Sequence, residues 1–261
     1  MIPKIIHYCW FGRNPKPPLA EKCLDSWKKY CPDYEIKEWN EDSYDLSQAP
    51  LYVRQAYEAK KWAFVTDYVR LQVVYEYGGI YLDTDVELVR NPAEFLSSPA
   101  FFGFEGDYSI ATGLGFGAEK EAGILKELMS DYQDIPFILD NGEMDLSPCP
   151  TRNTEVFLRK GLKLDGTSQV LDDGTLILSA EYFCPLDNAT RILRKTKNTI
   201  SIHHFDASWQ PQEQKDAHDK LARQRRKQLR YKNIRYFPKR VVRKLIGNCL
   251  YERIKEKILN K

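Results

Sequence analysis

The stretch that decides the fold of this 261-residue chain is WAFVTDYVRLQVVYEYGGIYLDTD, residues 62–85. Apolar side chains recur at three- and four-residue steps in its first part, which predicts a helix over residues 54–77. Gly78 and Gly79 follow, where the end of a helix favours glycine. Residues 80–82 then have the composition of a short buried strand that stops at Asp83.

The preceding residues have the same alternating pattern. Residues 4–10 (KIIHYCW) predict a strand, residues 19–30 have helical apolar spacing, and residues 34–39 (YEIKEW) alternate like a second strand. Further elements are expected downstream, with strands at 100–104 and 110–117 and helices at 124–132 and 154–161. Strands that alternate with helices predict an α/β domain with a largely parallel sheet.

The charge of the chain is unevenly distributed, although 39 basic and 37 acidic residues leave a net charge of only +2. Residues 220–261 contain 16 Lys and Arg against two acidic residues, and the first 219 residues contain 23 basic against 35 acidic residues. The chain is therefore an acidic body with a basic tail. We expect one α/β domain over residues 1–210 and a basic helical extension over residues 211–261.

Two helices are expected in the extension. Residues 212–232 are almost entirely polar, and a four-residue apolar stripe runs from Val242 to Ile258, with Pro238 between them at a typical helix start. A cationic helix with an apolar stripe is typical of an anchor on an anionic membrane surface, here through residues 220–261. The alternative is that the helices pack on the body and present a basic face to water.

Other classes of protein are disfavoured. The chain has no run of eighteen apolar residues and no secretory signal pattern, so we expect it to stay in the cytoplasm. Its six cysteines contain no CxxC pair and are expected to be free thiols. A nucleic-acid partner is not expected, because the tail lacks the glycines and interleaved aromatic residues of a base-stacking platform.

Asp83 and Asp85 form the first candidate site. Residues i and i+2 of an extended chain share a face, so both carboxylates can face one cation, which removes their mutual repulsion. The pair directly follows a buried strand, at the carboxyl edge where α/β folds bind ligands. A solvated turn is the simpler explanation for an isolated Asp-x-Asp, and the strand in front of this one favours a site.

Asp67 and Arg70 form the second candidate. They lie three residues apart and therefore share one face of the predicted helix. They form either a structural ion pair or a binding unit in which Asp67 accepts from sugar hydroxyls and Arg70 contacts hydroxyls or phosphate.

The histidines and a tryptophan supply the remaining candidates. His203 and His204 are adjacent in IHHFDASW, residues 202–209, and in a strand only one of them can face the acid pair. Trp10 ends the first predicted strand at the same carboxyl edge, and His7 lies within that strand. Both of these side chains have an alternative place in the core.

Four motifs occur in order along the chain: IPKIIHYCWFG at residues 2–12, A-x-x-T-D-x-x-R at 63–70, YGGIYLDTD at 77–85 and IHHFDASW at 202–209. Together they resemble the family 32 glycosyltransferases, DXD sugar transferases with relatives in bacterial capsular and exopolysaccharide synthesis. That family is distantly similar to the glucosyltransferase domains of large clostridial toxins and to yeast mannosyltransferases. The resemblance covers residues 1–210, and residues 211–261 lie outside it.

The resemblance implies a GT-A fold, a Rossmann-like α/β sheet flanked by helices that binds a nucleotide-sugar and a divalent cation, Mn²⁺ or Mg²⁺. Asp85 resembles the direct metal ligand, and Asp83 resembles the acid that contacts sugar or ribose and reaches the metal through water. His203 and His204 stand where related transferases bring a further ligand, so the expected metal set contains all four.

The resemblance also implies which residues bind the nucleotide-sugar. Trp10 resembles the tryptophan that stacks on the base, and Trp209 resembles the indole that contacts the departing phosphate. Asp67 and Arg70 resemble the pair that holds the donor sugar, and with the two DXD acids they form the expected catalytic set. The full nucleotide-sugar set on this basis is His7, Trp10, Asp67, Arg70, Gly79, Asp83, Ser208 and Trp209.

The implied reaction is the retaining transfer of a hexose from a UDP-sugar to a saccharide acceptor, with galactose as the first candidate for the hexose. The expected acceptor is an isoprenoid-diphosphate-linked oligosaccharide of capsular or cell-surface polysaccharide synthesis, which places a bacterial enzyme peripherally at the inner face of the plasma membrane. No pattern supports a nucleophilic carboxylate at Glu105, Asp107 or Asp140. A metal-dependent nucleotidyl- or phosphotransferase is the rival function, because a strand-end acid pair also serves that chemistry.

Overall fold

The computed structural model describes residues 1–207, 210 and 212–247, with the side chains of residues 232–246 left out. The chain divides into two compact units. One, called the body below, comprises Met1–Asp187 and Leu193–Trp209, and the other comprises Asn188–Ile192 and Gln210–Lys261. The expected domain limit at residue 210 stays a prediction.

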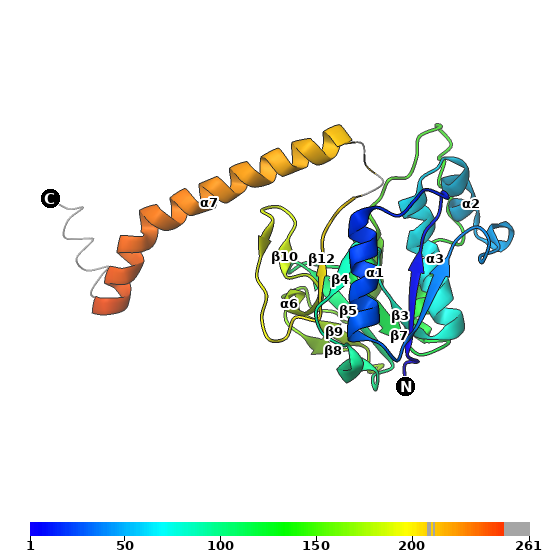
Figure 1. Ribbon diagram of the computed structural model, residues 1–261, viewed down its shortest axis with the longest axis horizontal. Helices are drawn as coiled ribbons and strands as arrows, with labels where there is room; N and C mark the ends of the chain where they lie inside the picture. Colours follow the sequence, from blue (N-terminus) through cyan, green and yellow to red (C-terminus); the bar gives the residue numbers. More distant parts are fainter. Residues whose placement is uncertain (208–209, 211, 248–261) are drawn as a thin grey trace. The chain divides into compact units, whose positions relative to one another are not determined.

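An eight-stranded sheet forms the centre of the body, in the order β2-β1-β3-β7-β5-β9-β8 with β6 paired to β5 (Figure 1). Its strands are β1 (Ile5–Cys9), β2 (Glu35–Trp39), β3 (Gly79–Tyr81), β5 (Ala100–Glu105), β6 (Ser109–Ile110), β7 (Phe116–Ala118), β8 (Gln169–Val170) and β9 (Leu176–Leu178). β1 runs parallel to β2 and β3, and β5 runs parallel to β9. The predicted α/β class is confirmed.

The sheet is mixed, so the prediction of a largely parallel sheet was wrong. β7 runs antiparallel to both of its neighbours, β3 and β5, and β8 runs antiparallel to β9. The reason lies in the connections, because a parallel pair needs a crossover of a dozen or more residues, usually a helix. Between β5 and β7 the chain has only β6 and a short 3-10 helix, η3 (Thr112–Leu114).

Helices cover both faces of the sheet. Alternate strand residues point to opposite faces, so Ile80 and Phe101 join one buried apolar cluster with α1 (Pro18–Tyr30), and Tyr81 and Phe102 join another with α3 (Trp62–Tyr77). The remaining helices of the body are α2 (Leu51–Glu58), α4 (Gly123–Ser130), α5 (Cys149–Arg159), α6 (Ala180–Phe183), η1 (Leu46–Gln48) and η2 (Ala93–Phe95).

Two small strand pairs lie outside the main sheet. β4 (Val86–Leu88) pairs antiparallel with β12 (Ser201–His203), and β10 (Leu186–Asp187) pairs with β11 (Ile192–Leu193). α1 anchors β4, because Trp27 Nε1 donates to the carbonyl of Val86 at 2.7 Å. The β4-β12 pair brings a segment from late in the sequence beside the acid pair.

Two predicted elements of the body are interrupted. The single helix expected over residues 54–77 is two helices, α2 and α3, because Lys60 between them adopts a left-handed backbone with φ of 56°. The strand expected over residues 110–117 is divided by η3.

In the tail, α7 (Gln212–Ile246) is one continuous helix that passes through Pro238, so the predicted helix start there was wrong. An interior proline removes one backbone hydrogen bond and its ring crowds the carbonyl four residues earlier, yet the helix continues on both sides of Pro238. The part of the apolar stripe beyond residue 247 lies outside the described residues. None of the helices in the described part of the chain is both long enough and apolar enough to cross a bilayer.

Candidate metal and sugar-binding site

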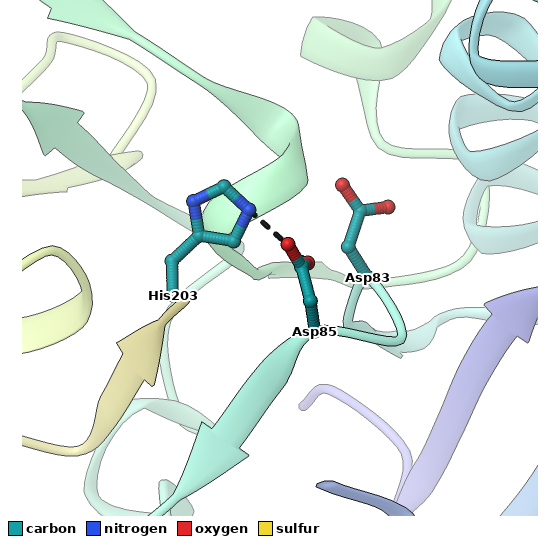
Figure 2. Close-up of side chains that lie close together, drawn as sticks. All are labelled: Asp83, Asp85 and His203. Atoms are coloured by element: carbon teal, nitrogen blue, oxygen red, sulfur yellow. Dashed lines mark ion pairs between the residues drawn. The ribbon is translucent and has the colours of Figure 1, made fainter. Parts of the chain in front are cut away.

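Asp83, Asp85 and His203, called the acid cluster below, converge at the end of β3 (Figure 2). The two aspartates lie in the turn between β3 and β4, and His203 is the last residue of β12. Antiparallel pairing places His203 opposite Val86, and therefore next to Asp85. One ligand atom from each of the three side chains lies within 4.8 Å of the others, and His203 Nε2 is 3.2 Å from Asp85 Oδ1.

The acid cluster shifts the pKa of each member. Burial alone would raise the pKa of Asp85, but the charge and hydrogen bond of His203 lower it to about 2. Burial alone would lower the pKa of His203, but Asp85 raises it above its usual value of 6.5. Burial raises the pKa of Asp83 against the opposing charge of Arg70. The cluster therefore holds one firmly ionised carboxylate beside one that is costly to ionise.

The donor set of the cluster fits a divalent cation. Carboxylate oxygens suit Mg²⁺ and Mn²⁺, and an added imidazole nitrogen favours Mn²⁺ over Mg²⁺, which prefers oxygen ligands. The backbone supports this arrangement, because Asp206 N–H donates to Asp85 Oδ2 at 2.9 Å. His203 Nδ1 is buried without a hydrogen-bond partner, so Asp85 is the polar group that orients the ring.

Arg70 connects the acid cluster to Asp67. Its NH2 is 2.5 Å from Asp67 Oδ1, and its NH1 is 3.5 Å from Asp83 Oδ2. Its Nε donates to the carbonyl of Thr66 at 2.9 Å, and Tyr81 donates its hydroxyl hydrogen to Asp83 Oδ1 at 2.9 Å. Burial raises the pKa of Asp67 to about 6, and the charge of Arg70 opposes that rise. Asp67 and Arg70 therefore form an ion pair on α3, and the same guanidinium also contacts Asp83 of the DXD motif.

A short loop that was not predicted from the sequence lies against this ion pair. A Cβ atom built on Gly113, in η3, would be 2.5 Å from Asp83 Oδ2 and 3.1 Å from Arg70 NH1, so only glycine allows this approach. The preceding Thr112 places its Oγ1 3.2 Å from Cys149 Sγ, and Asn153 Nδ2 lies 3.0 Å from the same sulfur. The two glycines of ATGLG, residues 111–115, are the only feature of the sequence that points to this loop.

His204 and His7 lie outside the acid cluster, and their binding roles stay predictions. His204 Nε2 is 2.8 Å from Glu87 Oε2, because adjacent strand residues face opposite sides. His7 is fully buried, with Nε2 2.8 Å from the carbonyl of Gly78 and Nδ1 accepting from Trp39 Nε1 at 3.0 Å. With both of its ring nitrogens engaged, His7 has no free atom for a nucleotide.

Gly79, also predicted to bind the nucleotide-sugar, serves the fold. Its φ is 116°, and a Cβ there would lie 2.7 Å from the carbonyl of Ile5. Trp10 is half-buried at the end of β1, with Nε1 donating to the carbonyl of Asn14 at 2.6 Å and Lys16 Nζ 5.9 Å from the ring centroid. The predicted residues Ser208 and Trp209 lie outside the described residues.

Comparison with known proteins finds a family model that matches the segment around the DXD motif. Residues 17–102 match the family described as a glycosyltransferase sugar-binding region containing a DXD motif. This match confirms the predicted resemblance to DXD glycosyltransferases and includes Asp67, Arg70, Asp83 and Asp85. The family number stays a prediction.

A curated relative is similar over part of its length. Inositol phosphoceramide mannosyltransferase 3 of Schizosaccharomyces pombe is 34% identical over 107 residues, which cover 38% of this chain and 29% of the relative. The chain therefore matches less than a third of that protein's length.

Similar solved structures include three glycosyltransferases. The PaToxG glycosyltransferase has a TM-score of 0.44 and 19% identity, covering 60% of this chain and 69% of that one. A glycosyltransferase involved in glycosylation of the major capsid of PBCV-1 has a TM-score of 0.44 and 17% identity, with 82% and 98% covered. The galactosyltransferase LgtC has a TM-score of 0.41 and 14% identity, with 84% and 95% covered.

Proposed function

We propose that this chain is a metal-dependent, retaining glycosyltransferase that transfers a hexose from a UDP-sugar to a saccharide acceptor. Galactose is the first candidate for this hexose. The observation that carries the proposal is the acid cluster, joined through Arg70 to Asp67 within and beside a segment that matches a DXD sugar-binding region. Cation ligands and sugar-binding groups in one connected unit suit a nucleotide diphosphate-sugar.

The strand order supports a nucleotide at this edge. β2 and β3 lie on opposite sides of β1, so the chain reverses its direction of winding between β1 and β3. Ligands of α/β sheets bind in the crevice outside the carboxyl ends of strands at such a point. Trp10 follows β1 and Asp83 follows two residues after β3, which suits a base on the first and a diphosphate near the second.

In this proposal the acid cluster, Asp67 and Arg70 have separate roles. Asp83, Asp85 and His203 would hold the divalent cation, which supplies positive charge to the departing diphosphate. Asp67 accepts hydrogen bonds from sugar hydroxyls. Arg70 presents a guanidinium whose Nε and NH2 are already held by Thr66 and Asp67, so it stabilises developing negative charge without reorganising.

Retention of configuration is proposed to follow same-face attack, with the departing phosphate oxygen taking the proton of the acceptor hydroxyl. A double displacement would instead need a carboxylate nucleophile. Asp107 and Asp140 are exposed, whereas Glu105 is half-buried, its pKa is raised by burial, and it faces the charge of His203. A Glu105→Gln variant that keeps donor turnover supports same-face attack, and one that loses turnover supports double displacement.

The acceptor and the membrane surface form the second part of the proposal. Between Lys220 and Arg230, α7 carries six basic and no acidic residues, and the described side chains there are exposed apart from Ala222. Such a helix suits the anionic leaflet that carries an isoprenoid-diphosphate-linked acceptor. We therefore expect a peripheral enzyme at the inner face of a bacterial plasma membrane.

Vesicle sedimentation tests this second part. The full chain should co-sediment with vesicles containing phosphatidylglycerol and not with pure phosphatidylcholine, and Arg223→Glu with Arg226→Glu and Arg230→Glu should abolish binding. Hydrolysis of a soluble donor by the same variant is the control and should not change. Equal binding of the wild type and the triple variant would show that the helix does not bind this surface.

A panel of nucleotide-sugars tests the reaction itself. With Mn²⁺, one UDP-sugar should raise the melting temperature and release UDP slowly, and EDTA should remove both effects. Release of nucleoside monophosphate or transfer of phosphate would instead favour a nucleotidyl- or phosphotransferase. No response to any nucleotide-sugar in the presence of Mn²⁺ would overturn the proposal.

A further inference from the structure

Arg152 and Tyr132 each hold a buried polar atom that has no hydrogen-bond partner. These atoms are Nε of Arg152, in α5, and the hydroxyl oxygen of Tyr132, which follows α4 and is 1% exposed. Unsatisfied buried donors are rare in folded proteins, and each one calls for an explanation such as a ligand or an ordered water. Two of them on facing side chains make a ligand worth considering.

The two side chains are held firmly in place. The guanidinium carbon of Arg152 lies 5.6 Å from the ring centroids of both Tyr52 and Tyr132, and these two rings are 5.2 Å apart at 72°. Asp145 accepts a hydrogen bond from the NH2 group of Arg152. A guanidinium confined between two rings and one carboxylate is preorganised, so its remaining donors can bind a ligand at little entropic cost.

This pair adjoins the sugar side of the candidate site. Cys149 lies one turn before Arg152 on α5, and its sulfur contacts Thr112, the neighbour of the glycine that approaches Arg70. The charges agree with this placement. Burial raises the pKa of Asp67, with the charge of Arg152 among the opposing effects, and burial together with nearby Cys149 and Asp67 raises that of Tyr132.

The donor inventory selects the kind of ligand. Asp67 only accepts hydrogen bonds when ionised, Arg152 only donates, and the Tyr132 hydroxyl does both. Sugar hydroxyls both donate and accept, so neighbouring hydroxyls match this set. A phosphate would meet Asp67 and Asp145, and two carboxylates repel it. The side chain of Arg152 keeps 18% of its surface exposed, whereas its Nε and the Tyr132 hydroxyl are buried, so a hexose that binds them must displace the atoms that cover them.

We propose that Arg152 and Tyr132 bind hydroxyl groups of the transferred hexose and determine which hexose the site accepts. This inference rests on the proposed function and names its sugar-selecting residues. The two buried donors remain unpaired in the protein alone because their partners belong to the substrate.

Tyr132→Phe is the decisive variant, because it removes only the unpaired hydroxyl. Affinities of UDP and of UDP-glucose, UDP-galactose and UDP-N-acetylglucosamine are measured by calorimetry with Mn²⁺ for the full chain. UDP affinity should change less than twofold, whereas the preferred UDP-sugar should lose ~3- to 10-fold, as expected for one hydrogen bond. The melting temperature of the free protein should stay the same or rise, because an unsatisfied group has gone.

Two controls keep the test sharp. Tyr68→Phe removes a hydroxyl that accepts from Gln133 Nε2 at 3.3 Å, and it should leave the preference among sugars unchanged. Arg152→Lys keeps the charge beside Asp145 but removes the Nε donor, and it should lower UDP-sugar affinity with UDP affinity retained. If Tyr132→Phe and Arg152→Lys keep the full gain of UDP-sugar over UDP for every sugar, the buried donors bind water only and the inference is overturned. Wild-type protein that binds no UDP with Mn²⁺ would instead overturn the proposed function.

Discussion

His7 and His203 are two imidazoles withdrawn from solvent on strands of the body, and their neighbours differ completely. His7 lies among Trp39, Tyr77 and the carbonyl of Gly78, and each of its ring nitrogens has one neutral partner. His203 faces the carboxylates of Asp85 and Asp83. Burial lowers the pKa of His7 to about 4, whereas Asp85 raises that of His203 in spite of burial.

The difference shows what makes a buried polar group a candidate for ligand binding. Around His7 the protein satisfies every donor and acceptor itself, so the group contributes to stability and has nothing left to offer. Around His203 the fold places more acidic than basic side chains. The arginine at the cluster, Arg70, is already shared between Asp67 and Asp83. Negative charge that the protein does not balance by itself favours the binding of a cation.

The largest effect is expected at Asp85. Asp85→Ala removes the ionised carboxylate of the acid cluster, and donor turnover should fall by at least ~10³-fold because electrostatic stabilisation of several kcal/mol is lost. The Mn²⁺-dependent rise in melting temperature should disappear as well. Glu87→Gln is the matched control, because Glu87 lies two residues further on and pairs with Lys22 and His204. Equal losses of donor turnover in the two variants would show that the acid cluster is not the metal site.

The next effect is expected at His7 and concerns stability. His7→Ala leaves the Trp39 indole N–H and the Gly78 carbonyl unpaired in the core, at a cost of about 3–4 kcal/mol of unfolding free energy. His7→Gln keeps one donor and one acceptor and should cost about 1 kcal/mol. Urea unfolding measures both. A large loss of UDP affinity in folded His7→Gln protein would restore the predicted nucleotide-binding role of this residue.

The pH dependence of stability should separate the two histidines. Because the folded pKa of His7 is about 4 and its ordinary value is 6.5, the unfolded chain binds more protons between these values. His7 therefore stabilises the fold fully above pH 6.5, and about 3 kcal/mol is lost as the pH falls to 4. The difference in unfolding free energy between wild type and His7→Gln, measured by urea at several pH values, should therefore reverse its sign over this window, from about 1 kcal/mol in favour of the wild type to about 2 kcal/mol in favour of the variant. A difference independent of pH would contradict the neutral state of His7.

The smallest effect is expected from the pair His203 and His204. His203→Ala should weaken Mn²⁺ binding by ~10- to 100-fold, the range found when even an outer partner of a metal ligand is removed. His204→Ala should change Mn²⁺ affinity less than twofold, because its ring lies against Glu87. Titration of Mn²⁺ by calorimetry or by protection against thermal unfolding measures both. The reverse order of effects would show that His204 is the ligand.

Much of the body follows from local patterns. The strand at KIIHYCW, the helix over residues 19–30 and the strand YEIKEW were predicted within one or two residues, because hydrophobic periodicity acts over a few neighbouring residues. The break at Lys60 was missed, because a left-handed residue that is not glycine leaves no mark in the apolar pattern. The antiparallel β7 was missed, because strand direction depends on how the chain returns to the sheet.

The acid pair could be predicted from its position directly after a buried strand, although the turn between β3 and β4, and not an extended chain, brings the two carboxylates together. The sequence by itself determined the Asp67–Arg70 pair, which depends on helical spacing alone. The choice of His203 over His204 for the cluster depends on the register of β12 against β4, because a one-residue slip would exchange the two faces. Tertiary contacts also place His7 in the core and Gly113 against Arg70 and Asp83. These contacts join segments far apart in the chain, and no local pattern records which distant side chains will meet.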